Sequence, residues 1–170
     1  MQNRSIFLRI LIWILLVTGF SGCCSYSFTG TNPITAKTVT IDYFPNKASI
    51  INPTLSQVFT EKLRDKFLRQ TRLTQVQTDG ELYYTGFISN YVVSPAAVQG
   101  NAQTTLNRLT ITVNVRFENK LDPKANFEQD FSQFADFDAS VSVSQVEAQL
   151  IDEISDKLIQ EIFNRSVNNW

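Results

Sequence analysis

Residues that could carry chemistry are few in this 170-residue chain. Histidine is absent, and the only two cysteines are adjacent, at Cys23 and Cys24. Ser–His and Cys–His nucleophile pairs are therefore excluded, as are zinc sites built from cysteine and histidine. The four glycines that follow Cys24 are too widely separated to form a phosphate-cradling loop. Carboxylate-only or Ser–Lys chemistry remains open, but no pair of residues points to it, so we expect no enzyme activity, no metal and no cofactor.

The cysteines lie where a secreted protein is processed. Arg4 and Arg9 form a basic N-terminal region, and an apolar run of 11 residues follows from Ile10 to Phe20. The small residues Ser21 and Gly22 then precede Cys23. This order is typical of a secretory signal peptide. A transmembrane anchor is the competing interpretation, but it needs about 20 apolar residues to cross a bilayer.

Cys23 is the predicted site of lipid attachment. The sequence Phe20-Ser21-Gly22-Cys23 is similar to the lipobox, in which lipoprotein signal peptidase cuts before a diacylated cysteine, although leucine is commonest where Phe20 stands. Cys24 is the weaker candidate, because cleavage would then follow a cysteine. The alternative is a conventional signal peptide that is cleaved nearby without lipid attachment. It would leave two adjacent cysteine thiols, and a disulfide between neighbouring residues would stabilise the fold poorly. We therefore expect a signal peptide over residues 1–22, a lipidated N-terminus and tether over 23–36, and a single domain over 37–170.

The size and charge of the mature chain limit its class. Residues 23–170 have the length of one domain. They carry 13 basic and 16 acidic side chains, a net charge of −3. This net charge differs from the strongly positive charge that is typical of nucleic-acid-binding proteins.

Two amphipathic helices are predicted from apolar residues at helical spacing. The first opens with Asn52 as N-cap and Pro53 at the first helical position, and we expect it to end near Thr71. The second has the form of a capping box, with Ser144 as N-cap and Glu147 three residues later.

Alternating apolar and polar residues predict the strands. The alternation is clearest over 109–118 and also indicates strands at 37–44, 73–77 and 81–93. Phe127, Phe131, Phe134 and Phe137 have helical spacing, but their segment follows a strand and a turn, so we interpret it as a bulged hairpin strand. The order of elements predicts an α+β two-layer sandwich, with a mainly antiparallel four- to five-stranded sheet and two helices on one face.

The strand at 81–93 carries aromatic residues on both of its predicted faces. By period two, Leu82, Tyr84, Ile88 and Val92 share one face, and Tyr83, Phe87 and Tyr91 share the other. A strand buried on both sides would explain this pattern. In a sheet covered by helices on only one face, the second aromatic set would be open and would suggest a partner surface.

Four segments together resemble a known family. They are 26–30, 52–57, 98–101 leading into 107–113, and the end of the C-terminal helix at 168–170. In order and spacing they are similar to the LPS-assembly lipoprotein family, LptE, in its Bacteroidota form, over essentially the whole mature chain. The resemblance implies a non-enzymatic subunit of the outer-membrane LPS translocon, which sits inside the β-barrel protein LptD, assists its assembly and binds LPS. It also implies two helices packed on a sheet.

The expected function is therefore a plug and assembly subunit, anchored by lipid at the periplasmic face of the outer membrane. The alternative is a periplasmic lipoprotein that carries a small apolar ligand or another lipoprotein, in a cavity lined by the four phenylalanines of 127–137. The predicted partners are an LptD-like barrel, LPS and the membrane, without nucleic acid. Candidate LPS contacts are Arg116, Lys120 and Lys124, and candidate barrel contacts are Tyr83, Phe87 and Tyr91.

Overall fold

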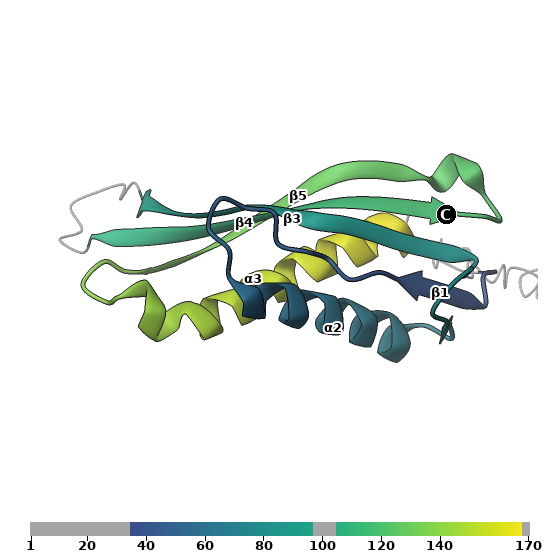
Figure 1. The fold of residues 1–170 in the computed structure, drawn as a ribbon, viewed down its shortest axis with the longest axis horizontal. Coiled ribbons are helices and arrows are strands. Elements are labelled where there is room, and N and C mark those ends of the chain that lie inside the picture. Colours follow the sequence, from purple (N-terminus) through teal and green to yellow (C-terminus); the bar gives the residue numbers. More distant parts are fainter. Residues whose placement is uncertain (1–34, 97–104, 168–170) are drawn as a thin grey trace, which may run out of the picture. The chain divides into compact units, whose positions relative to one another are not determined.

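The computed structural model describes residues 35–96 and 105–167. The predicted signal peptide, the lipid site at Cys23, most of the tether and the segments 98–101 and 168–170 lie outside the described residues. The elements, in chain order (Figure 1), are β1 (Thr38–Ile41), α2 (Pro53–Gln70), β2 (Thr74–Gln75), β3 (Leu82–Ala96), β4 (Leu106–Asn119), a 3₁₀ turn η1 (Pro123–Ala125), β5 (Phe127–Asp138) and α3 (Val143–Val167).

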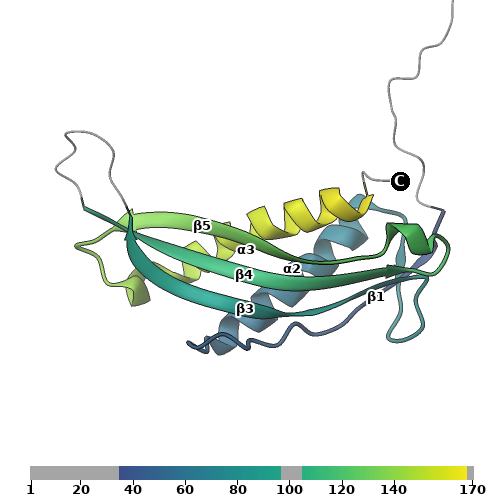
Figure 2. The same cartoon turned by 90° about the horizontal axis from the view of Figure 1, so that it is seen from above.

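One five-stranded sheet and two helices form the two layers. The strand order is β2-β1-β3-β4-β5. Strand β1 runs parallel to both β2 and β3, whereas β3, β4 and β5 are joined by antiparallel pairing. Both helices lie on the same face of the sheet, as the two perpendicular views show (Figures 1 and 2). The predicted α+β sandwich is confirmed, but the sheet is mixed, because the α2 crossover places β1 and β2 parallel.

Helix α2 begins and ends where its local sequence predicts. The side chain of Asn52 accepts hydrogen bonds from the backbone N–H groups of Thr54 and Leu55, at 2.9 and 3.1 Å. Pro53 occupies the first helical position, where no N–H is needed. At the other end, Thr71 caps the helix through hydrogen bonds from its hydroxyl and its backbone N–H to the carbonyl of Phe67.

Helix α3 begins one residue earlier than the predicted N-cap. It starts at Val143, so Ser144 lies inside the helix, and Ser142 immediately precedes it. The Glu147 carboxylate accepts a hydrogen bond from the Tyr91 hydroxyl at 2.5 Å. The predicted capping box is therefore wrong, because Ser144 lies inside the helix and the Glu147 carboxylate binds Tyr91 of β3.

A chain of aromatic rings joins the layers. Phe163 of α3 lies 5.1 Å, centroid to centroid, from Phe67 of α2, and Phe67 lies 4.7 Å from Tyr84 of β3. Tyr84 is 4.7 Å from Phe117 of β4, which is 5.3 Å from Phe127 of β5. Aromatic rings bury large areas and favour such tilted contacts. This chain makes the helices and the three long strands a single core.

A bulge in β3 changes which face its residues occupy. Ile88 pairs with Val113 and Asn90 pairs with Thr112, so Ser89 is an extra residue. One extra residue moves every later side chain to the opposite face. Tyr91 is consequently buried under the helices, with 3% of its surface exposed, and Val92 turns outward. The prediction that Tyr91 shares a face with Tyr83 and Phe87 is therefore wrong, and so is the matching assignment of Val92.

Strand β5 is regular. It pairs with β4 without interruption from Leu106 opposite Asp138 to Phe117 opposite Phe127, so the bulge predicted in this segment is wrong. Period two places Phe127, Phe131 and Phe137 toward the helices and leaves Phe134 on the other side, 43% exposed. The four phenylalanines therefore do not line one cavity; three pack in or against the core.

Candidate functional site

The face of the sheet away from the helices, called here the open face, is the candidate site. Helices cover only the other face (Figure 2). Alternation along the strands places on the open face the side chains of Tyr83, Thr85, Phe87, Arg108, Thr110, Thr112, Asn114, Arg116, Phe134 and Asp136. The open face therefore combines aromatic rings, hydroxyl and amide groups, and both signs of charge.

Two aromatic residues of β3 occupy the open face beside polar partners. The hydroxyl of Tyr83 donates a hydrogen bond to the carboxylate of Asp42, and this bond raises the pKa of Tyr83 above its usual value. The ammonium of Lys47 lies over the ring of Phe87, 4.5 Å from its centroid. Both rings are half-buried. The structure thus places two of the three predicted partner residues on the open face and buries the third, Tyr91.

Arg108, Asp136 and Phe134 form a cluster across β4 and β5. The guanidinium of Arg108 donates two hydrogen bonds to Asp136, at 2.7 and 2.9 Å, and lies 3.6 Å from the ring centroid of Phe134. The fork-shaped pair and the cation–π contact fix the orientation of the guanidinium. The Arg108 hydrogen bonds also hold the pKa of the Asp136 carboxyl below its usual range. This cluster was missed in the sequence because it depends on the register of two strands.

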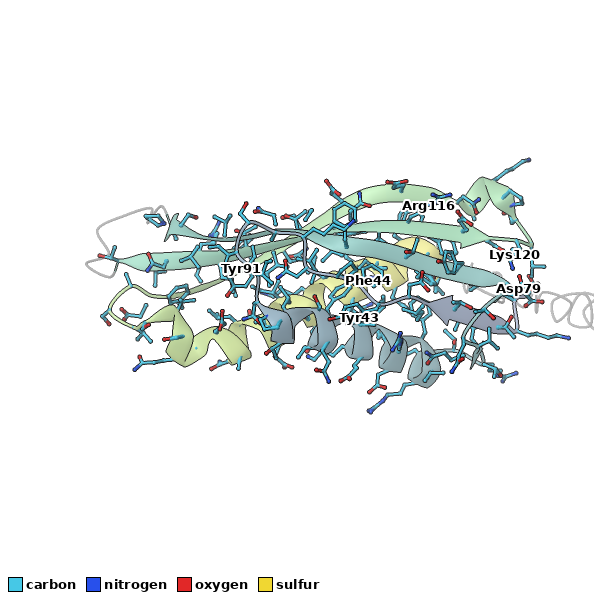
Figure 3. The ribbon with its side chains drawn as sticks, viewed as in Figure 1. Tyr43, Phe44, Asp79, Tyr91, Arg116 and Lys120 are labelled. Atoms are coloured by element: carbon cyan, nitrogen blue, oxygen red, sulfur yellow. The ribbon has the colours of Figure 1, made fainter. Side chains whose placement is uncertain are left out.

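The three predicted LPS contacts lie on β4 and in the turn that follows it. Arg116 forms an ion pair with Glu118 at 2.5 Å, and Lys120 forms one with Asp79 at 2.5 Å. Lys120 and Asp79 lie at one end of the sheet (Figure 3). Lys124 is exposed on η1 and makes no ion pair with any described residue. Two of the three cations are therefore locally paired, and both pairs are exposed to solvent.

The carboxylates of β5 outnumber the cations of β4. Glu128, Asp130, Asp136 and Asp138 occupy alternate positions on the open side of the strand. Asp130 accepts a hydrogen bond from the Asn114 amide at 2.9 Å. In the sequence, these acidic residues all fall at even positions. This pattern places them on one side only if the segment is a regular strand, which was not predicted.

The arrangement of the open face suits non-covalent binding. Its groups are hydrogen-bond donors and acceptors, aromatic rings and paired charges, which together can hold an amphipathic or polar surface. Across 35–96 and 105–167, no three acidic side chains converge on a point that could hold a metal ion. No helix in the same residues has the length and apolar character needed to span a bilayer.

Comparisons with known proteins place the chain in a family. Residues 36–166 match the model of the family described as "LptE: Lipopolysaccharide-assembly". The fold is similar to a minor lipoprotein from Acinetobacter baumannii, with a TM-score of 0.52 and 15% identity over 79% of this chain and 94% of that chain. It is also similar to a hypothetical protein from Chlamydia trachomatis, with a TM-score of 0.51 and 10% identity over 76% of this chain and 95% of that chain.

These two structural relatives support the fold alone, since their sequences have diverged widely. The comparison with curated proteins gives no match. The family model, however, spans most of the chain and covers every element from β1 to α3. The chain therefore belongs to the LptE family of lipopolysaccharide-assembly proteins.

Proposed function

We propose that this protein is a lipid-anchored subunit at the periplasmic face of the outer membrane, where it assists the assembly of an LptD-like LPS-export barrel, plugs it and binds LPS. Family membership supports a role in LPS assembly. The observation that carries the structural part of the proposal is the open face, which no described helix covers.

The polarity of the open face fits the interior of a barrel. The lumen of a large outer-membrane barrel is lined by polar side chains. A plug must therefore present hydrogen-bonding groups, with a few aromatic anchors. Strand β4 offers Thr110, Thr112 and Asn114 in a row. Strand β3 adds Phe87 opposite Asn114, and Tyr83 further along, opposite Glu118.

Arg116, Lys120 and Lys124 are the proposed contacts for the phosphate groups of LPS. Charge-assisted hydrogen bonds from arginine and lysine are the usual means of holding phosphate. The existing pairs with Glu118 and Asp79 are exposed, and exposed ion pairs contribute only about 0–1 kcal/mol. An anionic head group can therefore replace these carboxylates at low cost.

Because a lipid anchor would hold the protein at the membrane, a weak interface with the barrel would be sufficient for association. Each buried acyl CH₂ contributes about 0.8 kcal/mol, so two or three chains on Cys23 would hold the protein stably at the membrane. Tethering near an integral membrane partner also raises the effective concentration of the domain.

Cys23→Ala is expected to abolish acyl labelling and leave the precursor uncut, because both reactions require that thiol. Cys24→Ala, the matched control, should be labelled and processed normally. Metabolic labelling with a palmitate analogue, followed by gel mobility, measures both outcomes. Normal labelling of the Cys23 variant would contradict the assignment.

Two sets of substitutions test the open face and the turn that follows β4. Tyr83→Ser with Phe87→Ser should weaken co-purification with the barrel, whereas Arg116→Ser, Lys120→Ser and Lys124→Ser together should weaken LPS binding by about tenfold, the loss of one or two charge-assisted hydrogen bonds. Because all five side chains are on the surface or half-buried, both variants should still unfold cooperatively.

Matched controls lie on the exposed side of α2, where Leu68→Ser substitutes an apolar residue and Arg69→Ser a cation. Neither control should change barrel association or LPS binding. If the controls and both sets of variants behave alike in folded protein, neither the open face nor the turn after β4 is the working surface.

A further inference from the structure

The two edges of the sheet differ in length. At one edge β2 has two residues, and at the other β5 has 12. Natural sheets keep edges short, cover them or charge them, because an exposed edge strand can pair with another chain. Strand β5 is long enough to accept a complete additional strand.

The outward-pointing backbone groups of β5 belong to its even-numbered residues. The N–H of Ala139 bonds the carbonyl of Thr105, which shows that odd positions point toward β4. Consecutive residues of a strand alternate, so even positions point away from the sheet. The carbonyl of Phe134 confirms this direction, since it accepts a hydrogen bond from the ammonium of Lys157 on α3 at 3.2 Å.

Most of these outward groups are free within the described residues. The carbonyl of Phe134 is occupied by Lys157, and that of Asp138 is occupied by the N–H of Val141. The N–H and carbonyl groups of Glu128, Asp130, Ser132 and Asp136 have no hydrogen-bond partner in the described part of the chain. A strand placed alongside would satisfy them.

The chemistry beside this edge is acidic and polar. On the open side, the edge carries the carboxylates of Glu128, Asp130 and Asp138, together with that of Asp136, which already pairs with Arg108. On the helix side, a shallow groove of about 510 Å³ runs between β5 and α3, lined by Gln133, Asp156, Lys157, Gln160, Glu161 and Asn164. Side chains on one face of an added strand would lie over the carboxylates. Side chains on its other face would lie in this polar groove.

We propose that the free edge of β5 binds an extended, positively charged peptide segment of another protein, which adds to the sheet as a further strand. Main-chain hydrogen bonds would supply the affinity. Cations at alternate positions would pair with the acidic row, since opposite charges across neighbouring strands stabilise pairing and like charges oppose it. The same rule disfavours a second copy of this chain, whose β5 edge is equally acidic.

The N-terminal tether of the same chain lacks this chemistry. Residues 25–36 contain no lysine or arginine. The charge match therefore favours a partner chain as the occupant. The proposal rests on the backbone edge of β5 and does not require the proposed function, although the acidic row belongs to the open face.

A short capped peptide that alternates lysine with threonine and valine is a suitable probe for the full mature protein in detergent. Hydrogen exchange followed by NMR should show that the peptide slows exchange at the amides of Glu128, Asp130 and Ser132 by roughly tenfold or more, because each gains a hydrogen bond. Amides at odd positions already bond β4 and should not change. This alternation distinguishes strand addition from loose electrostatic attraction.

Two substitutions report on the edge itself. Ser132→Pro removes an outward N–H and should weaken peptide binding by about tenfold, whereas Ser132→Ala removes only the hydroxyl that contacts Thr112 and should bind normally. Lys157→Gln removes a cation from the groove and should strengthen binding. A peptide with glutamate in place of lysine should not bind.

Three results would overturn the proposal. One is an exchange effect without the even–odd alternation, which would mean electrostatic attraction alone. Another is equal binding by the proline and alanine variants when both unfold cooperatively. The third is protection of the same amides without peptide, rising with protein concentration, which would identify a second copy of this chain as the occupant.

Discussion

Replacing Phe67 by alanine is expected to lower the free energy of unfolding by about 3–5 kcal/mol, the usual cost of removing a fully buried phenylalanine. Phe67 is completely buried and contacts Tyr84 and Phe163, so it joins α2 to both the sheet and α3. Urea unfolding followed by circular dichroism measures the loss. The neighbouring Leu68→Ala, on the exposed side of α2, should change stability by less than about 0.5 kcal/mol. Equal effects of the two substitutions would contradict the packing described here.

Gly86→Ala is expected to destabilise the sheet by about 3 kcal/mol or more, because it forces the backbones of β3 and β4 apart. A Cβ at this position would lie 2.0 Å from the Asn114 carbonyl oxygen and 2.8 Å from the ring of Phe44. A backbone oxygen cannot rotate away as the end of a flexible side chain can. Thermal unfolding tests the prediction, with Thr85→Ala on the adjacent open-face position as control. An alanine variant with the wild-type melting temperature would show that the strands are not this close.

The sequence predicts well the elements whose limits are local. Asn52 and Pro53 set the start of α2, and the side chain that caps it belongs to the same turn of chain. The alternation in β4 is unbroken, and the strand assigned from it is confirmed. In both cases the deciding interaction lies within a few residues or repeats regularly along the segment.

The predictions failed where contacts between residues distant in the sequence determine the position of a side chain. The position of Tyr91 depends on the extra residue at Ser89, and that bulge exists only in the pairing of β3 with β4. The same displacement lets the Tyr91 hydroxyl reach Glu147, the residue that was expected to complete a capping box in α3. In β5, the helical spacing of the phenylalanines suggested an irregular strand, but continuous pairing with β4 sends Phe134 to the open face.

The candidate site could be predicted only in part for the same reason. Tyr83, Phe87 and Arg116 follow from alternation, and they lie on the face expected of them. The cluster of Arg108, Asp136 and Phe134 requires the register between two strands. The pairing of Lys120 with Asp79 requires two turns to meet at one end of the sheet. Neither contact has a signature in the linear sequence.

Site-specific photo-crosslinking in living cells tests most directly whether the open face meets the barrel. A photoreactive residue at Phe87 should crosslink to an outer-membrane β-barrel protein identified by mass spectrometry. The same residue at Gln57, exposed on α2, should give no such product if the helices face away from the barrel wall. Barrel crosslinks from Gln57 but not from Phe87 would contradict the account, because the helical face would then be the surface that the barrel encloses.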